Sequence, residues 1–237
     1  MNLHRCKNYK EMSALAAELV FGEIEKSPDL LFCAASGGSP RGLYKHMVER
    51  SKLDADFFSE MNIIKLDEWV GLPADSSFSS EYDIQEKLLK PIQHDLTRYI
   101  SFDSQTKNPQ IECDRIQDEL EESGPIDICI LGIGVNGHLA LNEPAEFLQT
   151  YCHVSKLSES TLSSGMIEKV GLPLAEGMTL GMGNIFESKK LILLVTGKGK
   201  KEIVNQFLTK KITNELPASL LWLHPNAEVI LDEEVLK

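Results

Sequence analysis

Two kinds of apolar pattern alternate along the chain. Apolar residues at the spacing of an α-helix predict helices over residues 9–25, 40–50, 81–89, 109–122 and 200–208. Short continuous apolar runs between them predict strands over residues 29–35, 61–66, 99–102, 126–131, 190–196 and 227–231. Continuous apolar runs, unlike alternating ones, are typical of strands that helices cover on both faces.

The alternation of strands and helices predicts the fold class. Strand–helix–strand units are joined by right-handed crossovers and therefore form a mostly parallel sheet. We expect an α/β fold of three layers, in which helices cover both faces of an open, mostly parallel, Rossmann-like sheet. No linker, charge block or repeat divides the sequence, so we expect a single domain over residues 1–237. The pattern is least regular within residues 146–177, where we expect a mobile flap.

The charge of the chain limits its partners. The 237 residues include 24 Lys and Arg against 36 Asp and Glu, which gives a formal net charge of −12. Because such a chain repels phosphate backbones and anionic lipid, we expect neither nucleic acid nor a membrane as a partner. An anionic small molecule would have to be bound by local positive groups.

The first residues and the cysteines indicate the compartment. The start, MNLHRCKNYKEM, has no apolar segment typical of a secretory signal, and no apolar run is long enough to span a bilayer. The five cysteines form no CxxC pair, and Cys33 and Cys129 lie inside apolar runs, where burial is the expected role. We therefore expect a reduced protein of the cytoplasm.

In an open parallel sheet, ligands bind beyond the carboxyl ends of the strands, so the residues after each strand are the candidates. The first such segment is SGGSPRGLYK, residues 36–45. Gly37 and Gly38 allow a tight turn that exposes N–H groups at a helix start, where Ser39 is a suitable N-cap and an anion can bind. Arg41 adds a positive charge. A plain, well-capped turn would have the same residues.

The second segment is KLDEWVGLP, residues 65–73. Asp67 and Glu68 are adjacent at a strand end, so one side chain can point into the cleft and the other away from it. A partly buried carboxylate there can serve as a general base. Two solvated loop acids are the alternative.

The third segment is LGIGVNGHLALNEP, residues 131–144, with glycines in a GxGxxG spacing. We reject a dinucleotide site because no long helix follows the glycines and Pro144 comes too soon. The turn presents Asn136, His138 and Glu143. A histidine with a carboxylate nearby suits proton transfer, since the carboxylate fixes its tautomer, although a structural histidine is the alternative. No second His or Cys stands at ligand spacing, so we expect no metal.

The fourth segment is TGKGKKE, residues 196–202. It again joins a strand end, a glycine and a helix start, and it carries Lys198, Lys200 and Lys201. It is either a second contact for an anion or a basic solvated loop.

Taken together and in this order, these segments resemble the hexosamine-phosphate deaminase/isomerase family, which includes glucosamine-6-phosphate deaminase and galactosamine-6-phosphate isomerase. The resemblance covers nearly the whole chain and is carried by SGGSPRGLY (36–44), KLDEWVGLP (65–73), LGIGVNGHLALNEP (131–144), TLGMGNI (179–185), LLVTGKGK (193–200) and LPASLLWLHP (216–225). LDEW, NGHLALNEP and PASLLWLH are most similar to the galactosamine branch. The family fold is one α/β domain of the deaminase/isomerase type.

The resemblance implies a reaction on an aminosugar 6-phosphate without a metal or an organic cofactor. The ring opens, a proton moves from C2 to C1 and ammonia leaves. Galactosamine 6-phosphate, which gives tagatose 6-phosphate, is the expected substrate. Glucosamine 6-phosphate, which gives fructose 6-phosphate, is the alternative.

The resemblance also implies the catalytic roles. Asp67 is the base for the C2 proton, His138 assists ring opening and Glu143 holds His138. Enzymes of the glucosamine type often have Asp where this chain has Asn136. An amide cannot share a proton relay, so we expect Asn136 to orient its neighbours by hydrogen bonds.

The resemblance implies that the phosphate binds to Gly37, Gly38 and Ser39 of the turn, and that Lys200 supplies a positive charge. In the glucosamine branch the flap typically offers an Arg to the phosphate, but residues 156–162 contain none. Arg41 or Lys156 is expected to compensate. Relatives activated by an effector carry basic residues where this chain has His153 and Ser155, so we expect no such activation.

A lactonase and a sugar-phosphate sensor are the other functions to consider. Related phosphogluconolactonases have DGHTASLFP in place of NGHLALNEP, and Glu143 separates the two patterns. A sugar-phosphate sensor would need a helix-turn-helix and a basic face, which the acidic charge and the chain length oppose. Self-association is not predicted either way, because relatives range from monomers to hexamers.

Overall fold

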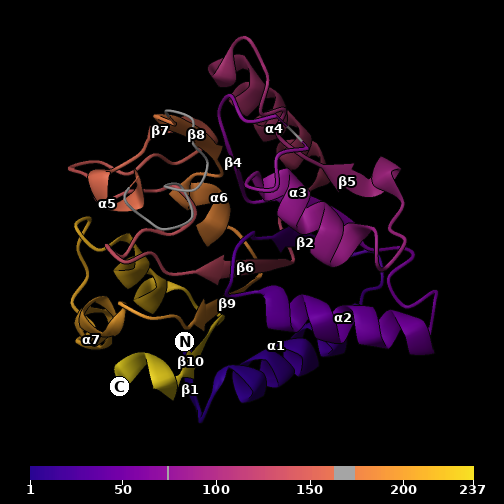
Figure 1. Cartoon of the computed structure of the whole chain (residues 1–237), viewed down its shortest axis with the longest axis horizontal. Helices are drawn as coiled ribbons and strands as arrows, with labels where there is room; N and C mark the ends of the chain where they lie inside the picture. Colours follow the sequence, from indigo (N-terminus) through magenta and orange to yellow (C-terminus); the bar gives the residue numbers. More distant parts are fainter. Residues whose placement is uncertain (74, 163–173) are drawn as a thin grey trace.

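The computed structural model describes residues 1–73, 75–162 and 174–237. Its centre is a seven-stranded sheet with the strand order β1-β10-β9-β6-β2-β3-β5, in which every neighbouring pair is parallel (Figure 1). The strands are β1 (Asn2–Cys6), β2 (Leu31–Ala34), β3 (Asn62–Lys65), β5 (Tyr99–Ile100), β6 (Ile128–Gly132), β9 (Lys190–Val195) and β10 (Ala227–Asp232). The predicted parallel sheet is confirmed.

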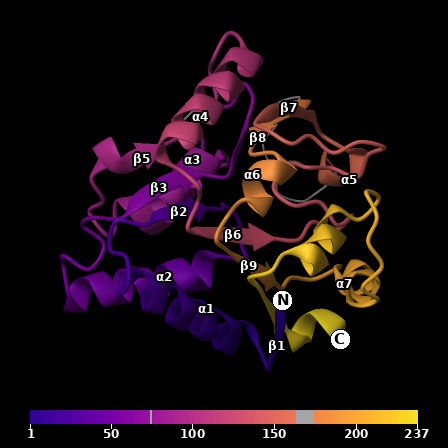
Figure 2. The same cartoon turned by 180° about the vertical axis from the view of Figure 1, so that it is seen from behind.

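Helices cover both faces of this sheet. They are α1 (Tyr9–Ile24), α2 (Arg41–Leu53), α3 (Ser80–Ile84), α4 (Pro109–Ser123), α5 (Glu159–Leu162), α6 (Met182–Phe186) and α7 (Lys201–Leu208). A π-helical turn (Gln85–Leu89) continues α3, and 3-10 turns cover Leu96–Arg98, Pro217–Leu223 and Glu233–Leu236. Figures 1 and 2 show α1 and α2 side by side on one face and α4 and α6 on the other, which confirms the three layers.

A second, antiparallel sheet was not predicted. It has three strands in the order β4 (Asp67–Trp69), β8 (Glu176–Thr179) and β7 (His153–Lys156), and it lies against α4. Strands this short carry no recognisable period. The small sheet matters for function because β4 follows β3 after one residue, so the chain leaves the parallel sheet at Leu66 and immediately presents Asp67.

Three other local predictions are corrected. The edge strand β1 was missed because NLHRC has too few apolar residues for a buried-strand pattern. The predicted helix 81–89 is a short α-helix followed by a π-helical turn. Ser39 does not cap α2, because the helix begins at Arg41 with Pro40 in the cap position and no side-chain cap bond.

The predicted strands form the centre of the core. Phe32, Ile64, Ile130 and Leu194 are fully buried, as a sheet covered on both faces requires. All five cysteines are free and buried, which confirms the prediction for Cys33 and Cys129. Within the described ranges, no helix combines the length and the apolar character needed to cross a membrane. Part of the expected flap, residues 163–173, lies outside the described residues.

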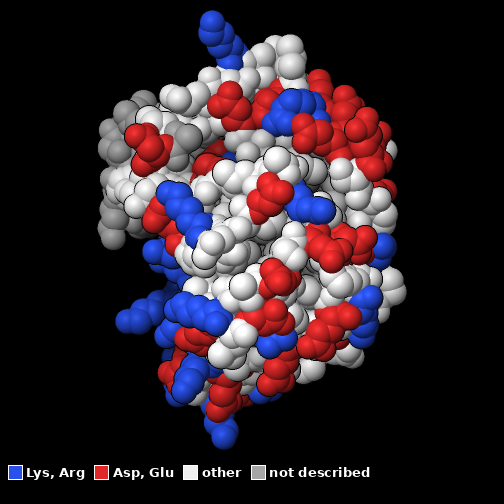
Figure 3. All heavy atoms as spheres, turned by 90° about the vertical axis from the view of Figure 1, so that its right-hand side faces the viewer, with Lys and Arg blue, Asp and Glu red and all other residues white. Residues whose placement is uncertain are grey.

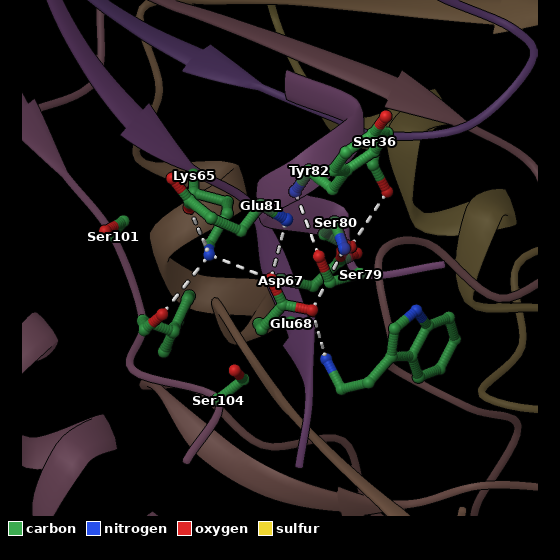
Figure 4. A network of polar contacts seen from close by, with 12 residues as sticks. Ser36, Lys65, Asp67, Glu68, Ser79, Ser80, Glu81, Tyr82, Ser101 and Ser104 are labelled. Atoms are coloured by element: carbon green, nitrogen blue, oxygen red, sulfur yellow. Dashed lines mark hydrogen bonds and ion pairs between the residues drawn. The ribbon is translucent and has the colours of Figure 1, made fainter. Parts of the chain in front are cut away.

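A buried ion cluster joins the two sheets where β3 ends. The Lys65 side chain is fully buried, and its Nζ donates to Glu68 Oε2 at 2.9 Å, to Glu81 Oε2 at 2.7 Å and to the carbonyl of Phe102 at 3.2 Å (Figure 4). Glu81 also accepts a hydrogen bond from Tyr99 at 2.9 Å. Because an unpaired ammonium cannot be buried without a large penalty, these partners are obligatory.

Glu68 extends this cluster to the start of α3. Its Oε1 accepts the backbone N–H groups of Trp69 at 2.8 Å and Ser80 at 3.0 Å, and its Oε2 accepts that of Glu81 at 2.7 Å. One carboxylate therefore ties β4 to the first turn of α3 and, through Lys65, to β3. Glu68 is not the solvated loop acid that the sequence left open.

We predict that Lys65→Met lowers the free energy of unfolding by about 3–5 kcal/mol, because it leaves the Glu68 and Glu81 carboxylates without their cation. Denaturant unfolding measures the change. The control is Lys26→Met, whose side chain is 70% exposed and pairs with Glu23 at 3.2 Å. That variant should lose at most about 1 kcal/mol. Equal losses in the two variants would contradict the prediction.

Candidate active site

A pocket of about 280 Å³ opens at the carboxyl ends of the central strands. Its walls come from the segments after β2, β3 and β6, together with the start of α7. The residues that line it are Ala35, Ser36, Gly37, Gly38, Ser39, Leu66, Asp67, Trp69, Gly132, Ile133, Gly134, Val135, His138, Ala140, Leu141, Thr161 and Lys200. Most of the predicted site residues therefore share one pocket, where parallel strands place a ligand.

Asp67 supplies the carboxylate of this pocket. Burial, and then the negative charge of neighbouring Glu68, raises its pKa to about 6. A hydrogen bond from the Ser80 hydroxyl at 3.3 Å and the positive potential of His138 and Lys65 partly oppose this rise. A carboxylate with a pKa near 6 is ionised at neutral pH and is a much stronger base than an exposed aspartate.

The two adjacent acids point in different directions, as the sequence predicted. Asp67 lines the pocket, whereas the Glu68 side chain is fully buried against Lys65 and the backbone of α3 (Figure 4). The division of roles is a consequence of the extended backbone of β4, in which successive side chains point to opposite faces.

His138 is held by an acidic partner on the other side of the pocket. Its Nδ1 lies 3.4 Å from Glu143 Oε2 and 3.4 Å from the hydroxyl of Thr161. Thr161 donates to Glu143 Oε1 at 2.5 Å, and Asn136 donates to Glu143 Oε2 at 2.6 Å. Burial alone would raise the pKa of Glu143. Hydrogen bonds from His138, Thr161 and Asn136 and the positive charge of His138 outweigh burial and lower this pKa to about 2.

Asn136 makes hydrogen bonds to both Glu143 and His138. Besides donating to Glu143, its Oδ1 accepts the backbone N–H of His138 at 3.3 Å. The amide therefore connects the histidine backbone with the carboxylate that faces the ring.

Two glycines of the third segment are required by their surroundings. A Cβ on Gly134 would lie 2.4 Å from Nε2 of the His138 ring, so any side chain there would displace the imidazole. Gly137 has a φ of +85°, and a Cβ there would meet Leu216 at 2.1 Å. These glycines serve the placement of His138 rather than the binding of a dinucleotide.

One part of the pocket wall is suited to an anion. Gly37, Gly38 and Ser39 form its turn, and Gly37 has a φ of +92°. Lys200 lines the pocket from the start of α7, and burial lowers its pKa. Backbone groups and one ammonium therefore face the same space, which is the local positive region that an acidic chain needs to bind an anion.

Acidic side chains dominate part of the surface. Figure 3 shows Asp and Glu side chains gathered over the upper right part of one face, with Lys and Arg more frequent toward its lower left edge. With a net charge of −12, the chain needs local positive groups to bind an anion.

Arg41 lies outside the pocket wall. Its Nη2 donates to Asp83 Oδ1 at 2.9 Å, and Oδ2 of the same carboxylate accepts the N–H of Gly37 at 2.9 Å. The structure thus pairs Arg41 with Asp83, and one N–H of the expected anion turn is already occupied. Lys156 and Lys198 are exposed and do not line the pocket either.

Sequence reasoning missed Thr161 and Ser80. Thr161 bonds Glu143 and approaches His138, and Ser80 bonds Asp67. Both are small hydroxyl residues in segments without an apolar period, so the available signal was their presence in polar stretches, within the expected flap for Thr161 and at the start of a helix for Ser80. Across the described ranges, no group of three or more His, Cys, Asp or Glu could hold a metal ion.

Comparison with known proteins relates this site to sugar-phosphate enzymes. A family model described as glucosamine-6-phosphate isomerases/6-phosphogluconolactonase matches residues 9–231. The Escherichia coli K12 protein named "Putative deaminase AgaI" is 38% identical over 224 residues, covering 94% of this chain and 89% of that protein. Glucosamine-6-phosphate deaminase of Clostridium perfringens strain 13 is 33% identical over 239 residues, covering 100% and 99%.

Solved structures show the same architecture. A monomeric glucosamine-6-phosphate deaminase superposes with a TM-score of 0.93 at 29% identity over 100% of both chains. The 6-phosphogluconolactonase of Leishmania guyanensis superposes with a TM-score of 0.80 at 21% identity, over 99% of this chain and 97% of that one. The second likeness shows a shared fold alone. The expected deaminase/isomerase type of Rossmann-like fold is confirmed.

We predict that Asp67 titrates near pH 6 rather than near its ordinary value of 3.8. The test is NMR titration of carboxyl carbons in protein labelled with ¹³C at aspartate, with Asp67→Asn used to assign the resonance. Burial and the charge of Glu68 are the physical reasons. A midpoint near 4 would contradict the prediction.

Proposed function

This chain belongs to the family of glucosamine-6-phosphate isomerases and 6-phosphogluconolactonases, and we propose that it converts an aminosugar 6-phosphate into a ketose 6-phosphate and ammonia. The observation that carries the proposal is that Asp67 and His138, which Glu143 holds, line one pocket together with Lys200 and a glycine turn suited to an anion. A base, a proton carrier and a phosphate site are the three parts that this reaction needs.

The first step opens the sugar ring at His138. The imidazole takes the proton of the C1 hydroxyl as the bond from C1 to the ring oxygen breaks, and the imidazolium then gives this proton to the ring oxygen. Glu143 faces Nδ1 at 3.4 Å and, with its pKa lowered to about 2, stays ionised, so it supports the imidazolium that forms in passing.

The second step moves a proton at Asp67. In the open-chain aldehyde the C2 proton is acidified by the carbonyl, and the ionised carboxylate removes it. The C1 oxygen takes a proton from the ammonium group at C2, which gives an enolamine. Asp67 then returns a proton to C1, which leaves a C=N bond at C2. Water adds to that bond and ammonia leaves, so that the product is the ketose.

The phosphate is bound at the glycine turn that lines the same pocket. The backbone turn of Gly37, Gly38 and Ser39 and the ammonium of Lys200 hold it there. Because Arg41 is paired with Asp83 in this structure, we do not assign it a direct contact with the phosphate.

Within this reaction we propose galactosamine 6-phosphate as the preferred substrate, which gives tagatose 6-phosphate. The support is the similarity of LDEW, NGHLALNEP and PASLLWLH to the galactosamine branch. Glucosamine 6-phosphate is the alternative, and the name of the Clostridium perfringens relative supports it. The two sugars differ only in the configuration at C4, so both belong in one test.

An assay panel tests the substrate. Purified protein is given galactosamine 6-phosphate, glucosamine 6-phosphate and 6-phosphogluconolactone, and the release of ammonia and of acid is followed. We expect ammonia from both aminosugars, with kcat/KM at least about tenfold higher for galactosamine 6-phosphate, the difference of one or two well-placed polar contacts. A higher value for glucosamine 6-phosphate would reverse the assignment, and no ammonia from either would end the proposal.

The base is tested with Asp67→Asn. The amide has nearly the same shape but cannot accept the C2 proton, so kcat should fall by about 10³-fold or more while substrate binding is largely kept. Exchange of the C2 hydrogen with deuterated solvent isolates this step, because it requires the base and not the loss of ammonia. Exchange at the rate of the unchanged protein would show that the base lies elsewhere.

A further inference from the structure

The hydroxyl of Ser80 lies between the pocket wall and the Asp67 carboxylate. Ser80 Oγ donates to Asp67 Oδ1 at 3.3 Å, and it lies 2.9 Å from Ser36 Oγ (Figure 4). Because the Ser80 proton is directed at Asp67, Ser36 is the donor of the second bond. The two hydroxyls therefore form a short chain that points from the pocket wall to the carboxylate.

The backbone of Ser80 is fixed by the buried cluster. Its N–H donates to Glu68 Oε1 at 3.0 Å, and the next N–H, of Glu81, donates to Glu68 Oε2 at 2.7 Å. Glu68 is in turn held by Lys65 at 2.9 Å, and neither side chain has any exposed surface. Only 2% of Ser80 is exposed, and its backbone is held by Glu68. Its hydroxyl therefore cannot move far from Asp67.

The same short helix also contacts the anion turn. Three residues after Ser80, Asp83 accepts the N–H of Gly37 at 2.9 Å. The side chains of α3 therefore contact both the Asp67 carboxylate and the turn that begins at Gly37.

We propose that Ser80 is a positioning residue for Asp67, which orients the carboxylate and favours its ionised form. The consequence for the reaction rests on the proposed function, whereas the contact itself can be tested without any substrate. Among the described residues, Ser80 donates the one hydrogen bond that the Asp67 carboxylate receives. The hydroxyl thereby fixes Oδ1 and leaves Oδ2 as the oxygen to accept a proton.

The charged groups around Asp67 define what the hydroxyl does. Glu68, on the same strand, disfavours the ionised carboxylate, whereas His138 from the third segment and Lys65 from β3 favour it. These charges remain when only the hydroxyl is removed. Loss of the Ser80 bond should therefore make Asp67 harder to ionise, by about one pH unit, because a hydrogen bond to a charged acceptor is stronger than one between neutral groups.

The first experiment measures this shift in the free protein. Asp67 is titrated by NMR of its carboxyl carbon in the unchanged chain and in Ser80→Ala. We expect the midpoint to rise by about one pH unit. An unchanged midpoint in the folded variant would overturn the proposal. If Ser80→Ala does not fold, Ser80→Cys takes its place, since a thiol is close in size and a weak donor, and its midpoint should rise as well.

The matched control is Ser104→Ala. Ser104 is buried to a similar degree, 3% exposed, and its hydroxyl donates to the carbonyl of Leu72 at 2.6 Å rather than to Asp67. Ser104→Ala removes a hydroxyl from the same region and should leave the titration midpoint of Asp67 unchanged. An equal rise in this variant would mean that general loosening of the region moves the carboxylate, and the proposal would fail.

The second experiment measures turnover of the aminosugar phosphate against pH. A base with a midpoint shifted from about 6 to about 7 loses about eightfold in kcat/KM at pH 5.5 and almost nothing at pH 8.5. We expect this pattern for Ser80→Ala. A loss of equal size at both pH values would point to a structural role alone and would overturn the proposal.

The two experiments separate this inference from the proposed function. If the unchanged protein releases no ammonia from any aminosugar phosphate, the proposed function fails, and the NMR titration still decides whether Ser80 controls Asp67. If ammonia is released and neither the titration nor the pH profile of Ser80→Ala differs, the function stands and the role of Ser80 is wrong.

Discussion

The buried ammonium of Lys65 is the constraint on which the rest of the site depends. A fully buried cation must be surrounded by acceptors, and Lys65 obtains them from β4, from α3 and from the segment after β5. Glu68, drawn inward by this cation, also accepts N–H groups from the first turn of α3. Because Glu68 points inward from an extended strand, its neighbour Asp67 must point to the opposite side, into the pocket. The side chains of Lys65, Glu68 and Glu81 do not line the pocket, yet they decide where the pocket has its carboxylate.

The site combines two carboxylates of different acidity with a positive region. Burial and the charge of Glu68 raise the pKa of Asp67, while a network of donors lowers that of Glu143. The pKa values of the two carboxylates are thus shifted in opposite directions, as a general base and a permanent counter-charge would require. A glycine turn and Lys200 line the same pocket. An acidic protein can bind an anionic substrate in this way, because the relevant potential is local and the low dielectric of the pocket strengthens it.

Much of the site was predictable, since its residues follow apolar runs. The runs before Gly37, Asp67 and Asn136 have the composition of covered parallel strands, and the carboxyl ends of such strands meet at one edge. Arg41 was expected to support the phosphate but pairs with Asp83. Nothing local marks this pairing, because the two residues are far apart in sequence and Asp83 belongs to a helix with only five residues. Thr161 and Ser80 were missed for the same reason: a hydroxyl acquires a role only through the partner that the fold brings to it.

The sequence by itself determined the three-layer parallel sheet, the edge at which the chemistry lies and the residue types that supply it, because apolar periodicity and glycine turns are local properties of the chain. The tertiary structure alone decided which of the two adjacent acids is buried away from the pocket, which cation is available to the pocket and which hydroxyls contact the carboxylates. Each of these outcomes depends on burial and on contacts between segments distant in sequence. Such contacts set pKa values and side-chain directions, and no pattern of neighbouring residues encodes them.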